Sequence, residues 1–187
     1  ELYGDTDCSV EGVYGKACSF DGVDDYVETE ADDSLNITSD FSIFAWIKAK
    51  EDTENYHQIV GQYKYVDPSG YGYSLYLSEG NLRVNIYAGT NGDNGADAIG
   101  ENDLRDNLWH YVGFTFDGNI IRVYENGVEV DTDGFSFYPE LLDNKVTVGF
   151  RSIYSDLPFN GLIDELMIFD KALTEDEVEW LYEGDLS

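Results

Sequence analysis

The chain has 187 residues, enough for one domain with a sizeable core, since a chain of this length buries roughly 70% of its unfolded surface. It carries 10 Lys and Arg against 39 Asp and Glu, a net charge of −29, which argues against nucleic-acid binding because phosphate neutralisation needs clustered cations. No apolar run approaches the roughly 18 residues that a membrane span requires, so we expect no membrane insertion.

The acidity of the chain has three candidate explanations at this point. Clustered carboxylates bind calcium, hydrated carboxylates keep a protein soluble at high salt, and a negative net charge aids solubility in general. The acidic residues are scattered over nearly every turn. This distribution favours a saline or generally acidic surface, with calcium accounting for only a few of the carboxylates.

The only two cysteines are Cys8 and Cys18, with Gly12 and Gly15 between them. An even count within one turn-rich segment predicts a disulfide, which would close a short loop worth roughly 2–3 kcal/mol. The alternative is two unrelated buried thiols. A disulfide indicates an oxidising, extracellular setting.

Apolar and polar residues alternate in short runs along most of the chain, and this two-residue period predicts strands. An Asn-Gly turn at 125–127 and polar turns at 78–81 and 117–119 join neighbouring runs as hairpins. Spacing of roughly ten residues predicts an all-β, antiparallel two-sheet sandwich. In chain order the predicted strands span 41–47, 73–77, 82–87, 110–116, 120–124, 128–130, 145–150 and 162–169.

One short helix is predicted at the C-terminus. Thr174 suits the N-cap, with Glu177 three residues on as a capping box. Val178 and Leu181 then share one face for docking, and Gly184 suits the helix end.

Two segments are predicted to lie at the rim of the sandwich, where ligand loops belong. The longest irregular stretch is 88–107, and a Gly- and Tyr-rich stretch spans 63–73. No internal repeat or linker is visible, so we interpret 1–187 as one domain, and the lack of a signal peptide suggests a piece excised from a larger surface protein.

Five segments, in order and at matching spacing, resemble laminin G-like domains of the concanavalin A-like lectin-glucanase superfamily. They are Gly15–Gly22, Phe41–Ile47, Trp109–Gly118, Asn126-Gly127 and Phe159–Glu165. The resemblance covers nearly the whole chain. It implies a two-sheet jelly-roll sandwich with a short C-terminal helix, and a fold that usually serves as a binding module.

The resemblance also implies a structural calcium. In such folds the first and last strands run side by side, which would bring the Asp21-Gly22 turn near the strand that carries Asp164. Related jelly rolls often hold calcium at such a place, so Asp21 and Asp164 are the implied ligands, and Asp25 is a weaker addition. The alternative is that Asp21 and Asp164 only bond turn amides.

Polar and aromatic side chains in the loops and strands are the candidates for sugar binding. Sugars stack on aromatic faces and form hydrogen bonds with Asp, Asn and Arg. Such tyrosines can also simply cover a sheet face, so this alternative stays open for each of them. The candidate ligand-binding residues are Tyr65, Tyr71, Tyr73, Asn85, Tyr87, Arg151 and Tyr154.

No catalytic motif stands out. The Glu-x-Asp-x-Glu pattern of related glycosidases does not occur, and Glu28 with Glu30 is the nearest approach. His57 lacks an obvious nucleophile partner, and His110, in the Trp-His segment, is predicted to be structural. We therefore predict that the chain is not an enzyme.

The sequence as a whole predicts a non-catalytic, extracellular carbohydrate-binding or cell-adhesion module with a structural calcium. Its expected partner is a glycan or a glycosylated cell-surface molecule. The alternatives are a protein–protein adhesion domain, a passive spacer and, least of all, a glycosidase.

Overall fold

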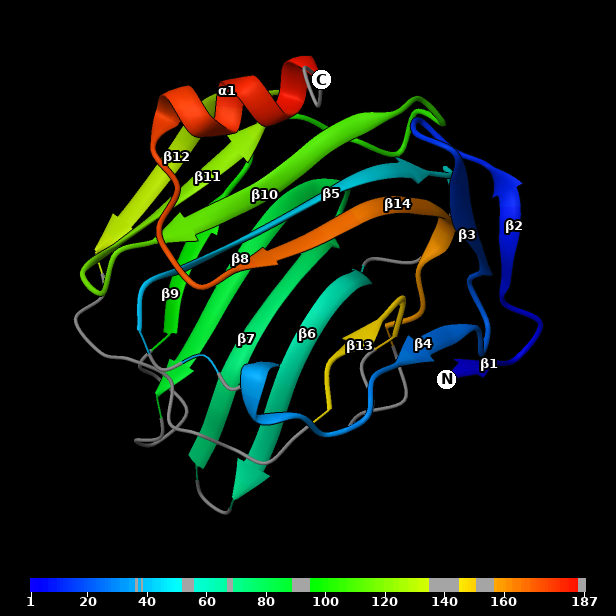
Figure 1. The fold of residues 1–187 in the computed structure, drawn as a ribbon, viewed down its shortest axis with the longest axis horizontal. Helices are drawn as coiled ribbons and strands as arrows, with labels where there is room; N and C mark the ends of the chain where they lie inside the picture. Colours follow the sequence, from blue (N-terminus) through cyan, green and yellow to red (C-terminus); the bar gives the residue numbers. More distant parts are fainter. Residues whose placement is uncertain are drawn as a thin grey trace.

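A computed structural model gives the fold (Figure 1). The structure describes residues 1–35, 37, 39–51, 56–66, 69–88, 95–134, 145–150 and 157–184. Two predicted ligand residues, Arg151 and Tyr154, lie outside these ranges. Tyr65 lies within a strand, but its side chain is not among those described.

In these ranges the chain forms two antiparallel sheets of seven strands each, packed face to face as a jelly-roll sandwich. The first, here called the open sheet, has the order β1 (Leu2–Tyr3), β4 (Tyr26–Glu28), β13 (Thr147–Val148), β6 (Tyr56–Val66), β7 (Ser69–Ser78), β8 (Asn81–Ala88) and β9 (Gly95–Ile99). The second, here called the covered sheet, has the order β12 (Val128–Gly134), β11 (Ile120–Glu125), β10 (His110–Phe116), β5 (Phe41–Ala49), β14 (Asn160–Phe169), β3 (Lys16–Asp21) and β2 (Asp7–Glu11). A 3-10 turn, Asp33–Leu35, precedes β5.

Strand β5 lies at the centre of the covered sheet and is buried on both faces. Phe41 and Ile43 point between the sheets into the main core, which they share with residues of β7, β8 and β10. Phe44 and Trp46 point the other way, into a second apolar cluster on the outer face of the sheet. The Trp46 ring lies 5.3 Å from the Tyr111 ring, measured between centroids.

Helix α1 (Glu175–Glu183) covers that outer face near β11 and β12, as Figure 1 shows. Thr174 and Glu177 form the predicted capping box, and Gly184 ends the helix at φ 74° in the left-handed region. Val178 is fully buried in the second cluster. The helix therefore closes one face of the sandwich with its predicted docking side.

Most of the predicted strands are present, and the pairing of β3 and β14 is confirmed, with Asp21 opposite Asn160. The prediction missed the strands β1, β2 and β4 near the N-terminus, and also β6 and β9. The long strand β6 includes part of the stretch that was predicted as a rim segment, and β9 lies within the stretch predicted to be irregular. Both belong to the open sheet, on either side of the β7–β8 hairpin.

The predicted disulfide joins Cys8 on β2 to Cys18 on β3. These are neighbouring strands at the edge of the covered sheet, with Asp7 opposite Ser19. The bond therefore fastens the last strand of this sheet to its neighbour.

Replacing both cysteines with serine should lower the free energy of unfolding by about 2–3 kcal/mol, because the unfolded chain regains the entropy of a short closed loop. Urea unfolding of the oxidised protein and the variant measures the difference. Reduced wild-type protein should behave like the variant. An unchanged urea midpoint after reduction would show that the bond contributes nothing.

Asp117 holds the turn between β10 and β11. Its Oδ1 accepts the amides of Asn119 at 3.1 Å and Ile120 at 2.9 Å, and its Oδ2 accepts Arg122 Nη1 at 2.7 Å. Partial burial acts to raise the pKa of Asp117, but the Arg122 guanidinium and the two amides outweigh it and hold the pKa below its usual range. The folded state thus favours the charged carboxylate.

A lowered folded-state pKa adds stability above the unfolded pKa of about 3.9, and this stability is lost as the pH falls. We expect Asp117→Asn to cost about 1 kcal/mol at pH 7, and the cost to shrink toward zero as the pH falls from about 4 to 2. Urea unfolding across this pH range measures it.

The comparison with wild type at each pH cancels the effect of the large net charge. As a control of equal charge change, Glu179→Gln on the exposed side of α1 should show little cost at any pH. A loss of stability in Asp117→Asn that does not change with pH would contradict the lowered pKa of Asp117.

Candidate functional site

A hollow on the outer face of the open sheet is the clearest candidate binding site. Its volume is about 140 Å³, and it is lined by Tyr56, Tyr76, Asn85, Tyr87 and Leu157. Four of these residues come from the three adjacent strands β6, β7 and β8, which form the broad face of this sheet in Figure 1.

Strand alternation places these side chains on the outer face. On β8, Val84 and Ile86 are fully buried in the core, so Asn85 and Tyr87 point away from it. On β7, Leu75 and Leu77 are likewise buried, and Tyr76 between them points outward.

Hydrogen bonds fix the polar base of the hollow. The Tyr76 hydroxyl donates to Asn85 Oδ1 at 2.8 Å, and the Tyr87 hydroxyl donates to the same oxygen at 3.0 Å. The Tyr56 and Tyr76 rings lie 6.3 Å apart at an angle of 37°. Tyr56 is 47% exposed, so its ring borders solvent. Three tyrosine side chains thus surround the side-chain amide of Asn85. Aromatic rings of this kind can stack on the ring of a ligand, and polar groups beside them can form hydrogen bonds with it.

Leu157 closes the hollow from a segment distant in sequence. Its carbonyl oxygen accepts a hydrogen bond from the backbone N–H of Gln58 at 3.0 Å, and the Pro158 carbonyl oxygen lies 3.1 Å from His57 Nδ1. His57 is therefore engaged in holding this segment against β6.

The structure brings together only some of the predicted ligand residues. Asn85 and Tyr87 share the hollow. Tyr73 does not contribute, because its ring lies in the core, 1% exposed and 5.5 Å from the Phe41 ring, where burial raises its pKa. Tyr71 is half-buried on the same face of β7 as Tyr73 and does not line the hollow.

Three residues that line the hollow were missed from sequence. Tyr76 had a signal, since it alternates with Leu75 and Leu77 and so faces opposite to them. Tyr56 and Leu157 had none, because their place depends on pairing between distant segments.

Among the predicted metal ligands, Asp164 accepts hydrogen bonds from backbone amides, which is the alternative that the sequence left open. Its Oδ2 accepts the amides of Val13 at 2.7 Å and Tyr14 at 3.1 Å, and its Oδ1 accepts the Glu165 amide at 2.9 Å. It lies four residues along β14 from Asn160, the partner of Asp21, which is about 13 Å at 3.3 Å per residue. Asp164 and Asp21 are thus too far apart to share one ion.

Asp21 and Asp25 do lie together, with Asp24 as a third member. Each offers a carboxylate oxygen, and these oxygens all lie within 4.8 Å of one another. Asp25 Oδ2 accepts the Asp21 amide at 2.9 Å, and Asp21 Oδ1 accepts the Val23 amide at 2.8 Å. Whether the cluster binds a metal remains a prediction.

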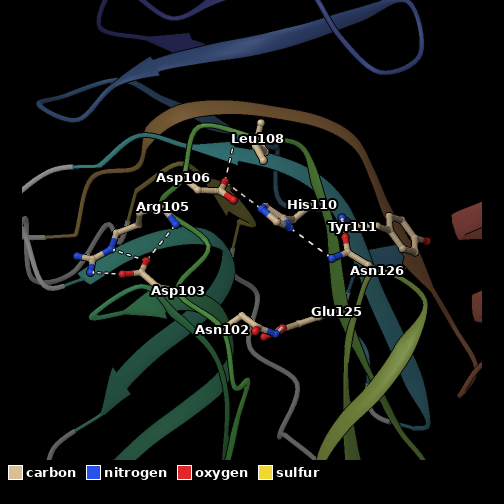
Figure 2. A network of polar contacts seen from close by, with 9 residues as sticks. All are labelled: Asn102, Asp103, Arg105, Asp106, Leu108, His110, Tyr111, Glu125 and Asn126. Carbon is tan, nitrogen blue, oxygen red and sulfur yellow. Dashed lines mark hydrogen bonds and ion pairs between the residues drawn. The ribbon is translucent and has the colours of Figure 1, made fainter.

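A second polar network lies where the segment after β9 enters β10 (Figure 2). Asp103 accepts two hydrogen bonds from the Arg105 guanidinium, at 3.0 and 2.9 Å, and these lower its pKa. Arg105 Nη2 also donates to the Glu79 carbonyl oxygen at 3.0 Å. The network thus fastens this segment to the β7–β8 turn.

His110 lies in the same network between Asp106 and Asn126. Its Nε2 is 3.0 Å from Asp106 Oδ1, and its Nδ1 is 3.3 Å from Asn126 Nδ2. Burial acts to raise the pKa of Asp106, but the Leu108 amide and His110 lower it overall. With both ring nitrogens engaged, His110 serves the structure of this segment, as the sequence predicted.

Of the helices in the described part of the chain, none combines the length and apolar character needed to cross a membrane.

Solved structures with a similar fold include binding domains of a mosquitocidal protein and of botulinum neurotoxins. The binding domain of Paraclostridial Mosquitocidal Protein 1 matches with a TM-score of 0.79 and 19% identity, over 97% of this chain and 46% of that chain. The receptor-binding domain of botulinum neurotoxin C/D mosaic serotype matches with a TM-score of 0.77 and 20% identity, over 99% and 46%. The botulinum neurotoxin serotype D ligand-binding domain, solved with N-acetylneuraminic acid, matches with 0.78 and 17%, over 99% and 45%.

At these identities the likeness shows a shared fold, and this chain spans less than half of each of the three structures. A search of curated protein sequences found no significant match. The family model of the concanavalin A-like lectin/glucanases superfamily matches residues 21–179, most of the chain. The chain therefore belongs to the concanavalin A-like lectin/glucanases superfamily.

Proposed function

We propose that this domain is a non-catalytic carbohydrate-binding module that acts outside the cell. The hollow formed by Tyr56, Tyr76, Asn85, Tyr87 and Leu157 is the observation that carries the proposal. Its tyrosine rings offer apolar faces for the C–H groups of a sugar, and its base is polar.

The hollow suits binding better than catalysis. Its described lining holds no carboxylate, whereas glycoside hydrolysis uses a pair of them. The similar toxin structures are also described as binding domains, which supports a non-enzymatic role. The disulfide supports an oxidising, extracellular setting.

The similar structures include one solved with N-acetylneuraminic acid, a sialic acid. That ligand belongs to a structure of which this chain matches less than half, so it does not define the sugar here. Sialic acid is an anion, while this chain has a net charge of −29 and the five lining residues carry no charge. The five residues themselves thus offer no cation to offset the cost of desolvating a carboxylate. We therefore propose a neutral sugar as the ligand.

A small open site of this kind gives weak affinity, on the order of a Kd of 1 mM. We expect Tyr76→Ala to weaken binding about tenfold, because it removes a stacking surface and a hydrogen bond to Asn85. Ligand-observed NMR titration with a panel of neutral oligosaccharides measures the change. Sialylated forms of the same sugars should bind more weakly than the neutral forms. This difference in affinity should shrink at high salt, because screening reduces the repulsion.

Tyr14→Ala is the matched control, because Tyr14 is exposed and lies on a turn of the other sheet. It should leave the Kd unchanged. Equal loss of affinity in the two variants, or no binding by any neutral sugar, would refute the proposed site. Tighter binding of the sialylated forms would refute only the choice of a neutral sugar, and the proposed site would stand.

A further inference from the structure

A cleft lies between the two sheets, on the side of the sandwich where the edge strands β1 and β2 lie (Figure 1). Its volume is about 200 Å³. Strands β3 and β14 of the covered sheet form one wall, and β4 and β13 of the open sheet form the other. The hollow of the proposed sugar site, in contrast, lies on the outer face of the open sheet, so the two are separate.

The interior of the cleft is apolar. Phe20 and Ile163 belong to the main core, and four further apolar residues pack against that core but stay partly exposed. An apolar cavity of about 150 Å³ is large enough to bind benzene. The cleft therefore has room for a branched aliphatic or a phenyl group. Its apolar lining residues are Cys18, Phe20, Val27, Val148, Ile163 and Leu166.

Three charged residues complete the described lining, and two of them lack a partner. Asp164 already accepts the backbone amides of Val13, Tyr14 and Glu165. The side chains of Lys16 and Glu165 form no ion pair or hydrogen bond with the residues that the structure describes. The cleft thus offers one free ammonium group and one free carboxylate beside an apolar interior.

A bulge in β14 places Glu165 at the cleft. The register of β14 against β5 shifts between Asp164 and Met167, and Glu165 between them has a φ of 44°. The left-handed region is costly for a residue other than glycine, and such outliers gather at binding sites. Bulges also change the direction in which a side chain points. The strained backbone is therefore a second observation that indicates a role for the Glu165 carboxylate.

The two opposite charges favour a ligand that carries both charges itself. The net charge of −29 would repel an apolar anion, which would also leave Glu165 unpaired. An apolar cation would leave Lys16 unpaired. An amino acid with an apolar side chain matches both groups, and its net charge of zero avoids the repulsion.

We propose that this cleft binds a free amino acid with an apolar side chain, such as leucine or phenylalanine. The side chain occupies the apolar interior, Glu165 accepts hydrogen bonds from the α-ammonium group, and Lys16 donates to the α-carboxylate. The site does not depend on the proposed sugar site.

Ligand-observed NMR titration at physiological salt tests the site, because salt screens much of the net charge. We expect leucine to bind with a Kd on the order of 1 mM. Glycine, which lacks the apolar side chain, should bind about tenfold more weakly. N-acetylleucine lacks the ammonium group and leucinamide lacks the carboxylate, so each should bind about fivefold more weakly than leucine.

Two variants test the two charges separately. Glu165→Gln should lose the preference for leucine over N-acetylleucine, and Lys16→Gln should lose the preference for leucine over leucinamide. The matched controls are Glu179→Gln and Lys50→Gln, which make the same changes of charge at exposed positions outside the cleft. Both controls should keep both preferences, and Tyr76→Ala should bind leucine as the wild type does.

A third variant, Val148→Phe, fills the cleft from β13. It should lose leucine binding while circular dichroism shows that it is folded. If it does not fold, the two charge variants still decide.

Several results would overturn the site. They are no saturable binding of leucine or phenylalanine, equal affinity for glycine and leucine, or an unchanged preference in Glu165→Gln. Equal loss of leucine binding in Glu179→Gln would also overturn it. None of these results bears on the sugar site, which the oligosaccharide titration of Tyr76→Ala tests separately.

Discussion

The double burial of β5 is the constraint on which the rest of the structure depends. Ile43 packs in the core between the sheets, and Phe44 packs in the cluster beneath α1, so both faces of this strand contribute to a buried apolar cluster. The helix has to cover the outer face of the covered sheet, because Phe44, Tyr111 and Tyr124 would otherwise meet water. The outer face of the open sheet needs no such cover, and it is there that polar and aromatic side chains form a hollow.

Local patterns were sufficient to predict the strands whose two faces differ and the helix whose cap is explicit. They were insufficient for β6 and β9. In β6 the alternation is broken by a register shift between Gln58 and Val60, and Gln58 is buried although it is polar. Its amide group donates to the Val60 carbonyl oxygen at 2.6 Å and accepts the Ser74 hydroxyl at 2.9 Å. The bond to Ser74 joins two different strands, so it leaves no local pattern.

The candidate sugar site shows the same limit at the level of single residues. Tyr73 and Tyr87 are equally plausible as ligand residues from composition, but they lie on opposite faces of the open sheet. Their orientation follows from their neighbours, since Leu75 shares the face of Tyr73 while Ile86 takes the face opposite to Tyr87. Parity along each strand therefore separates core from surface tyrosines. Only the tertiary fold supplies Leu157, because the contact depends on a segment about 80 residues further along the chain from β7.

The acidity of the chain is best understood by asking what each aspartate accepts. Asp7, Asp32 and Asp106 each accept the amide two residues further on, and Asp117 does the same in its hairpin. Such carboxylates replace a missing backbone partner in turns and need no cation. Part of the acidity of the chain therefore reflects turn formation. Asp25 differs because one of its oxygens is buried and has no hydrogen-bond partner among the residues that the structure describes. This difference separates Asp25 from the turn-forming aspartates.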